Sequence, residues 1–161
     1  MDELKISPAR FADADEILEV QKLAFHSEAE IHQNYTIPPL VQTIKSIQEE
    51  FSDYRFYKAT MGKNIIASVK VRILENNILQ IGRLVVLPDY QNRGIGKKLI
   101  RFIENTYEHV KAFELFTAEK SIRNTSFYKN LGYIIKGKYT EPGHSDIILL
   151  KFVKNNTTNS N

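Results

Sequence analysis

The sequence contains no cysteine, only seven glycines and five prolines, and no unbroken run of about 18 apolar residues. Without cysteine the chain can form no disulfide, no thiolate metal site and no cysteine nucleophile. Without a long apolar run, no membrane span or membrane partner is expected. The first residues, MDELKISPARFADAD, are acidic and mixed, which is unlike a secretory signal. We therefore expect the protein to be cytoplasmic.

Neither sign of charge dominates the chain. With 22 Lys and Arg against 19 Asp and Glu, the formal net charge is +3, so bulk charge predicts no nucleic-acid partner. The four histidines lack the spacing of a metal cluster, and we expect no bound metal. A length of 161 residues with 42% hydrophobic content fits one packed domain, which we place at residues 1–153. Residues 154–161, KNNTTNSN, lack apolar side chains and are expected to be disordered.

Apolar side chains recur with a period of two, typical of strands, and with a period of about 3.6, typical of helices. The predicted strands are Leu4–Ile6, Tyr54–Thr60, Ile65–Leu74, Ile78–Leu87, Phe113–Thr117, Tyr133–Tyr139 and Asp146–Val153. The predicted helices are a first one from Asp13 or Asp15 to about Ala24, then Leu40–Phe51, Ile95 to about Tyr107, and Ser121–Leu131, with a loop at His26–Pro39. This order predicts a mixed α/β fold with helices packed against one sheet.

The stretch Leu84–Gly96, LVVLPDYQNRGIG, predicts a buried strand, a turn and a helix that begins near two glycines. Such a helix leaves N–H groups free at its positive end, where an anion can bind. We interpret the stretch as a cradle for a diphosphate. Its spacing fits neither a P-loop nor a dinucleotide fingerprint. The alternative is an ordinary turn whose basic neighbours are merely solvated. Those neighbours are Arg93, Lys97, Lys98 and Arg101.

Two motifs resemble those of the GCN5-related N-acetyltransferase (GNAT) family. Gln91–Gly96, QNRGIG, is similar to the family's cofactor motif Gln/Arg-x-x-Gly-x-Gly/Ala, and Ser121–Tyr133 is similar to its second motif, with a Tyr and a later Gly-aromatic pair. The element order fits the family fold over roughly residues 3–153. The resemblance implies a mixed, mostly antiparallel sheet flanked by helices and splayed at its centre, with acetyl-CoA in the gap.

The resemblance also implies how acetyl-CoA, as co-substrate, would be held. Backbone N–H groups of Asn92–Lys97 would bind the pyrophosphate, and the pantetheine arm would pair with the preceding strand, where Gly82 would permit a bulge. An N–H near Val86 would polarise the thioester carbonyl, which is commonly worth about 3 kcal/mol of barrier. The expected cofactor-binding residues are Leu84, Val85, Val86, Gln91, Asn92, Arg93, Gly94, Ile95, Gly96, Lys97 and Asn124.

Tyr128 is the catalytic residue that the resemblance implies, because its hydroxyl would protonate the departing CoA thiolate. The alternative is a core residue with a satisfied hydroxyl. Ser121 stands where many members carry an Asn that touches the cofactor, so either Ser121 or Asn124 would take that contact, and we favour Asn124. The central strand lacks the Glu that serves several members as general base. Candidate bases elsewhere are Glu28, Glu30, His32, Glu119 and His144, or a water chain.

The resulting prediction is an N-acetyltransferase that moves an acetyl group from acetyl-CoA to a primary amine of a small molecule, by direct attack in a ternary complex. Acidic residues of the expected loop, Glu28 and Glu30, would attract a cationic amine. The alternatives are a non-catalytic acyl-CoA-binding or regulatory module, a protein N-terminal acetyltransferase, and a nucleotide-phosphate binder. A homodimer through an exposed strand edge or the last hairpin is possible.

Overall fold

The computed structural model describes residues 3–157 and folds them around one seven-stranded sheet in the order β1-β2-β3-β4-β5-β7-β6. The strands are β1 (Leu4–Pro8), β2 (Arg55–Met61), β3 (Asn64–Ile73), β4 (Ile78–Val86), β5 (Ala112–Ala118), β6 (Ile134–Glu141) and β7 (His144–Asn155). The helices are η1 (Phe11–Asp13), α1 (Ala14–His32), α2 (Pro38–Val41), α3 (Ile44–Glu50), η2 (Pro88–Tyr90), α4 (Ile95–Thr106) and α5 (Ile122–Asn130). All strand pairs are antiparallel except β4 with β5, which confirms the predicted mixed sheet.

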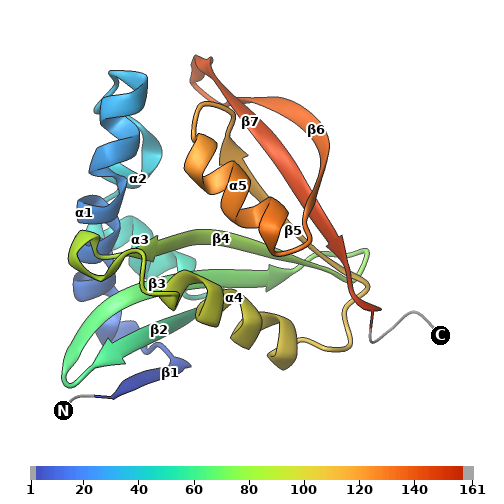
Figure 1. Cartoon of the computed structure of the whole chain (residues 1–161). Coiled ribbons are helices and arrows are strands. Elements are labelled where there is room, and N and C mark those ends of the chain that lie inside the picture. The colour runs from blue at the N-terminus through green and yellow to red at the C-terminus, as the bar shows by residue number, and fades with distance from the viewer. Residues whose placement is uncertain (1–2, 158–161) are drawn as a thin grey trace.

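The sheet is splayed between β4 and β5. These two strands pair only from Ile78↔Ala112 to Gln80↔Glu114. Beyond that point β4 stays with β3, while β5 stays with β7. Figure 1 shows β4 and β5 running apart from their paired end, with α5 lying beside the opening. The splay therefore leaves the far half of β4 without a strand on its β5 side.

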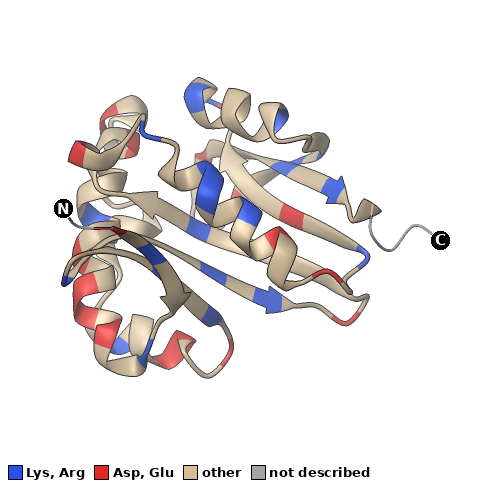
Figure 2. Cartoon of the chain, turned by 60° about the horizontal axis from the view of Figure 1, so that its bottom comes forward, with Lys and Arg blue, Asp and Glu red and all other residues tan. Residues whose placement is uncertain are grey.

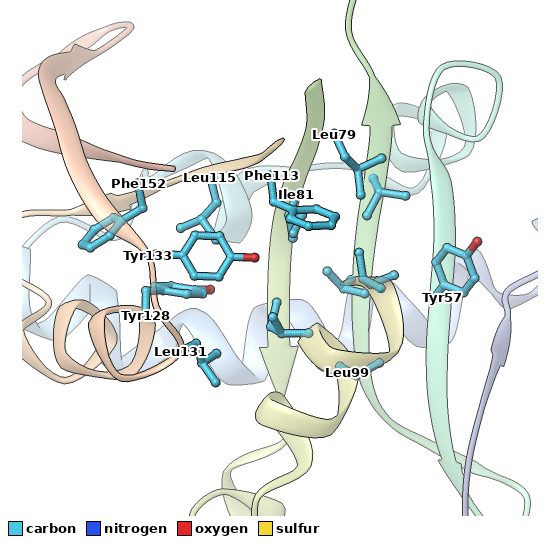
Figure 3. Packing of buried hydrophobic residues seen from close by; sticks show 14 of the residues in the cluster. Tyr57, Leu79, Ile81, Leu99, Phe113, Leu115, Tyr128, Leu131, Tyr133 and Phe152 are labelled. Carbon is cyan, nitrogen blue, oxygen red and sulfur yellow. The ribbon is translucent and has the colours of Figure 1, made fainter. Parts of the chain in front are cut away.

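Two apolar clusters hold the helices on the sheet. Leu99, Ile100 and Ile103 of α4 are fully buried in the larger cluster, which continues across β3, β4, β5 and β7. Figure 3 shows this cluster extending to Tyr133 and Phe152. The smaller cluster packs α1 and α3 against β2, β3 and β4. Burying one such side chain contributes about 1.5–3 kcal/mol, so α4 and α1 fix the position of β4 between them.

The predicted loop at His26–Pro39 is wrong over its first half, because α1 continues to His32. Its Glu, Ala and Ile residues favour helix, and no Gly or Pro precedes Pro38. The apolar period was weak because Ala29 is the only fully buried side chain in this last part of the helix. The helix ends where Gln33 adopts a left-handed φ of +50°. The extension places Glu28 on a rigid helix instead of a loop.

The predicted helix Leu40–Phe51 is two short helices, α2 and α3. Gln42 is extended between them, and its side chain accepts a hydrogen bond from the buried Gln21 Nε2 at 2.9 Å. Thr43 then caps α3, since its hydroxyl accepts a hydrogen bond from the Ser46 N–H at 3.1 Å. Helical spacing alone does not show a break that a capping residue and a tertiary contact create.

The domain boundary predicted at Val153 falls inside β7, which runs to Asn155. The next residue, Asn156, is buried, and its Nδ2 donates to the backbone carbonyls of Glu108 and Val110 at 2.8 and 2.9 Å. The ordered part of the chain therefore extends past the point where apolar residues end. The last predicted tail residues, 158–161, lie outside the described residues.

Candidate active site

The N-terminus of α4 faces the opening of the sheet and has no side-chain cap. Gly94 precedes the helix with a φ of +78°, a conformation that glycine adopts without strain, and Asn92 also has a positive φ. The first turn contains no acidic residue, and Figure 2 shows basic positions near the start of this helix. Free N–H groups and the positive end of the helix dipole together suit an anion.

Gly96 lets this helix end approach α5 closely. A Cβ at Gly96 would lie 3.3 Å from Cζ of Phe127 and 3.8 Å from Cδ2 of Leu84. A contact of 3.3 Å is tighter than ordinary van der Waals packing, so a side chain at position 96 would require the Phe127 ring to shift. The small residue in the motif therefore sets the spacing between the two helices that border the opening.

A β-bulge lies in β4 next to the predicted Gly82. Lys70 pairs with Gly82 and Ser68 pairs with Val85, so two residues of β4 face one residue of β3. The left-handed residue of this bulge is Arg83, with a φ of +50°, and not the glycine. The sequence thus located the bulge correctly but assigned its conformation to the neighbouring residue.

Past the bulge, Val86 directs its backbone toward the opening. The N–H of Leu87 donates to the carbonyl of Ile66 in β3 at 2.8 Å. Because adjacent strand residues point their backbone groups to opposite edges, the N–H of Val86 points away from β3. Gln91 Nε2 donates to the Val86 carbonyl at 3.0 Å. This edge of β4 can therefore pair with an extended ligand.

These parts enclose a first cavity of about 730 Å³ between β4, α1, α4 and α5. Its walls bring together all but one of the predicted site residues. Those that line it are Leu84, Val85, Val86, Gln91, Asn92, Gly94, Ile95, Gly96, Lys97, Asn124 and Tyr128. The exception, Arg93, is exposed with its guanidinium 5.2 Å from the ring centre of Tyr90. The volume is that of a typical small-molecule or cofactor site.

Arg123 of α5 is a cavity residue that the sequence reasoning missed. Its guanidinium donates to the side-chain oxygens of Asn92 at 2.7 Å and of Gln91 at 3.3 Å. It therefore ties α5 to the loop before α4 and adds a positive charge to the first cavity. One feature of the sequence could have indicated it: Arg123 lies four residues before Phe127 and therefore on the same face of the helix.

Tyr128 stands where the first cavity meets a second one. Its ring is buried against Tyr133 and Phe152, with ring centres 6.0 and 5.9 Å away, and Figure 3 shows the three rings together. Its hydroxyl has no hydrogen-bond partner within residues 3–157. Burial raises the pKa of Tyr128, so the hydroxyl keeps its proton at neutral pH. A protonated hydroxyl with no hydrogen-bond partner, on a ring that is otherwise buried, can donate to a ligand.

Glu28 lies opposite Tyr128 and also borders both cavities. The Ser121 hydroxyl donates to one carboxylate oxygen, and Asn124 Nδ2 donates to the other at 3.4 Å. His32 Nδ1 lies 3.9 Å from the same carboxylate. Ser121 and Asn124 both line the first cavity, so the preference for Asn124 as the cofactor contact stays a prediction. Together Ser121 and Asn124 hold the Glu28 carboxylate at the place where the two cavities meet.

The other candidate bases lie elsewhere, except His32. Glu30 is exposed and pairs with His26, Glu119 pairs with Lys138 at 2.7 Å, and His144 contacts Asn34. None of these three borders either cavity. The His32 side chain is buried in the wall of the second cavity. Of the five candidates, Glu28 and His32 are thus the ones near Tyr128.

The second cavity, of about 570 Å³, opens on the other side of the junction. It shares five residues with the first. The shared residues are Phe25, Glu28, Leu84, Asn124 and Tyr128. Its other walls come from α2, with Pro38 and Pro39, and from β3, β4, β5, β6 and β7. Two ligands could thus meet at Tyr128 and Glu28 while occupying separate cavities.

Within residues 3–157, no group of three or more His, Cys, Asp or Glu side chains is placed to hold a metal ion. None of the helices in this part of the chain combines the length and the apolar character needed to cross a membrane.

Solved structures of bacterial proteins share this fold. The ribosomal-protein-S18-alanine N-acetyltransferase from Escherichia coli aligns with a TM-score of 0.77 at 15% identity, covering 96% of this chain and 94% of that chain. The protein smu.2055 from Streptococcus mutans UA159 aligns with a TM-score of 0.78 at 20% identity, covering 94% and 98%. At such identities the likeness shows the fold alone.

The family follows from the sequence comparisons. A family model described as the acetyltransferase (GNAT) domain matches residues 25–149, so the chain belongs to the GNAT family, as its two motifs predicted. UPF0157 protein YqkA from Bacillus subtilis (strain 168) is 36% identical over 123 residues. The match covers 74% of this chain but 34% of that protein, so this chain spans about a third of that relative.

Proposed function

We propose that the protein transfers the acetyl group of acetyl-CoA to the primary amine of a small molecule, by direct attack in a ternary complex. The observation that carries this proposal is the meeting of two cavities at Tyr128 and Glu28. A ternary mechanism needs two substrates bound at once with their reacting atoms in contact. Two cavities that meet at shared residues suit that arrangement, because each substrate would have its own cavity and the reacting atoms would meet where the cavities join.

Acetyl-CoA would occupy the first cavity. Its pyrophosphate would lie on the N–H groups of Gly94–Lys97, where the dipole of α4 is positive and Arg123 adds charge. Its pantetheine arm would run along the free edge of β4, beside the Val86 N–H that points away from β3. These residues fit the cofactor because a diphosphate needs free donors and an amide-bearing arm needs an open strand edge.

In the reaction the amine nitrogen attacks the thioester carbonyl carbon, the carbon–sulfur bond breaks, and the sulfur leaves as a thiolate. The Val86 N–H would stabilise the developing oxyanion. Tyr128 would give its proton to the thiolate, and the proton that the nitrogen loses as the amide forms would pass to the Tyr128 phenolate and restore its hydroxyl. Glu28 is the base that we propose among the candidates, because an amine with a pKa near 10 must first lose a proton. The acceptor would lie in the second cavity.

The proposal is tested by incubating the purified chain with acetyl-CoA and a panel of amines while measuring CoA thiol release and the mass of the acetylated product. The panel contains amino acids, polyamines, aminoglycosides and peptides with a free N-terminus. Acetylation of a small amine supports the proposal. Acetylation of peptides alone would favour a protein N-terminal acetyltransferase, and binding of acetyl-CoA without transfer to any amine would favour a non-catalytic module.

A further inference from the structure

Arg83 occupies a strained position in the wall of the second cavity. It is the left-handed residue of the β4 bulge, just beyond the end of the β4–β5 pairing. A non-glycine residue with positive φ is strained and persists only where its surroundings hold it. Strain of this kind is often found at ligand-binding positions. Here the strained backbone places a guanidinium in the cavity.

The Arg83 side chain has no ion pair and no hydrogen bond with any residue of the described range 3–157. Burial lowers its pKa, and the charges of Glu50 and Glu141 only partly offset that effect. Glu50 is already paired with Lys70 at 2.9 Å. Arginine stays protonated even so, and its five donors need acceptors when water is excluded. A ligand anion in the cavity would provide them.

The charges of the second cavity are unevenly arranged. The cations Lys70, Arg72 and Arg83 all come from β3 and β4, and the first two lie over the Tyr54 ring at 4.2 and 4.6 Å. Glu28 lines the same cavity from α1, where Ser121 and Asn124 hydrogen-bond its carboxylate. The cavity is also lined by His32 and, from the end of β6, by Glu141. Cations from the sheet and the Glu28 carboxylate from α1 therefore border one cavity.

Building on the proposed function, we propose that the acetyl acceptor is an aminocarboxylate, such as a free amino acid, whose carboxylate binds Arg83 while its amino group lies between Glu28 and Tyr128. A guanidinium binds a carboxylate through two parallel hydrogen bonds, which fixes orientation as well as position. This differs from the simple cation expected from the sequence, because the structure adds a positive wall that a polyamine would avoid.

The test compares matched acceptors: a free amino acid, its carboxamide and its decarboxylated amine. The panel includes α-, β- and γ-amino acids. We expect kcat/KM for the preferred free acid to exceed that for its carboxamide by roughly 10- to 100-fold, as for one charged, desolvated hydrogen-bonded pair. The same comparison in Arg83→Asn should show no preference, because KM for the acid rises while the carboxamide is acetylated within about twofold of the wild-type rate.

Two substitutions separate charge from folding. Asparagine tolerates the left-handed backbone at position 83, so Arg83→Asn should fold. Arg83→Lys keeps the charge but loses the two-point geometry, and should retain part of the preference. Arg55→Asn removes the same charge from an exposed position outside both cavities and should leave the preference intact. Melting temperature and acetyl-CoA affinity, measured for each variant, show whether the fold and the first cavity survive.

Equal activity on acids and carboxamides, or an equal loss for all acceptors in a folded Arg83→Asn, would overturn this inference and leave acetyl transfer standing. Acetyl-CoA binding with no transfer to any acceptor would overturn the proposed function, and this inference with it.

Discussion

The two cavities that meet at Tyr128 are lined by different kinds of chemical group. The first takes its anion-binding groups from the backbone of one short segment, Gln91–Lys97, and from the adjoining edge of β4. The second is lined by charged and apolar side chains from helices and strands spread along the chain from Phe25 to Leu149. A backbone site is specified locally, whereas a side-chain site is assembled by the whole fold. The first cavity therefore contains the motif by which the family can be recognised, and we propose that the second selects the acceptor.

The largest expected effect is at the junction itself. In Tyr128→Phe the departing thiolate loses its proton donor, so kcat should fall on the order of 1000-fold. Affinity for acetyl-CoA, measured by calorimetry, should change less than about twofold because the ring and its packing remain. Tyr139→Phe, at an exposed tyrosine outside both cavities, is the matched control. Loss of binding with an unchanged kcat would contradict the role of Tyr128.

Glu28→Gln should impair the reaction of the acceptor amine without weakening acetyl-CoA binding. The amide keeps the size of the side chain but cannot take a proton, so kcat/KM for the amine should fall on the order of 100-fold. Acetyl-CoA affinity should stay within about twofold. Glu30→Gln, at an exposed acid two residues along α1 that lines neither cavity, should have no effect. If a water chain removes the proton instead, Glu28→Gln will retain nearly full activity.

Gly94→Ala should weaken acetyl-CoA binding without a direct effect on the acceptor cavity. The φ of +78° strains any side chain there, so we expect a loss of about 1 kcal/mol in unfolding free energy and roughly tenfold weaker acetyl-CoA binding. Gly143 in the β6–β7 turn also has a φ of +78° and an equally open surrounding. Gly143→Ala should therefore lose similar stability without losing affinity. Equal affinity loss in both variants would mean that strain, and not the cradle, is being measured.

Arg123→Gln should also weaken acetyl-CoA binding, but by less than Gly94→Ala. It removes one partly exposed charge and the link to Asn92 and Gln91, so acetyl-CoA should bind about three- to tenfold more weakly. Added salt should reduce the difference, because exposed charges are screened. Arg101→Gln on the outer face of α4 is the control for lost charge. Unchanged affinity in Arg123→Gln would place the pyrophosphate elsewhere.

The smallest effect expected concerns the pH dependence of kcat, which should be flat at alkaline pH. The pKa of Tyr128 is raised by burial, so its acid form persists above the ordinary value of about 10. With a saturating amine, kcat should therefore not decline between about pH 8 and pH 10. A decline with a midpoint below about pH 10 that is absent from Tyr128→Phe would show that the hydroxyl titrates earlier than its burial implies.

The sequence predicted the parts of the site that depend on local rules. Gly94 and the Gln91–Gly96 motif predicted a helix N-terminus with free N–H groups, and Gly82 inside the apolar strand Ile78–Leu87 predicted a bulge. The structure still assigns the left-handed residue to Arg83, because the register between β3 and β4 decides which residue is left over. Local sequence does not encode that register fully.

Longer-range features could not be predicted in the same way. Glu28 and Ser121 are hydrogen-bonded across 93 residues of chain, and Arg123 reaches Asn92 across 31. Such pairs depend on how α1 and α5 pack on the two sides of the splay. The extension of α1 to His32 was missed for a related reason, since a helix with one fully buried side chain in its last turns has little apolar period to detect.

The most direct test of the division between the two cavities is a calorimetric titration of the wild-type chain, Gly94→Ala and Arg83→Asn with acetyl-CoA. We expect one-to-one binding to the wild type, weaker binding to Gly94→Ala and unchanged binding to Arg83→Asn. Absence of binding to the wild type, or equal weakening in both variants, would contradict a cofactor cavity that is separate from the acceptor cavity.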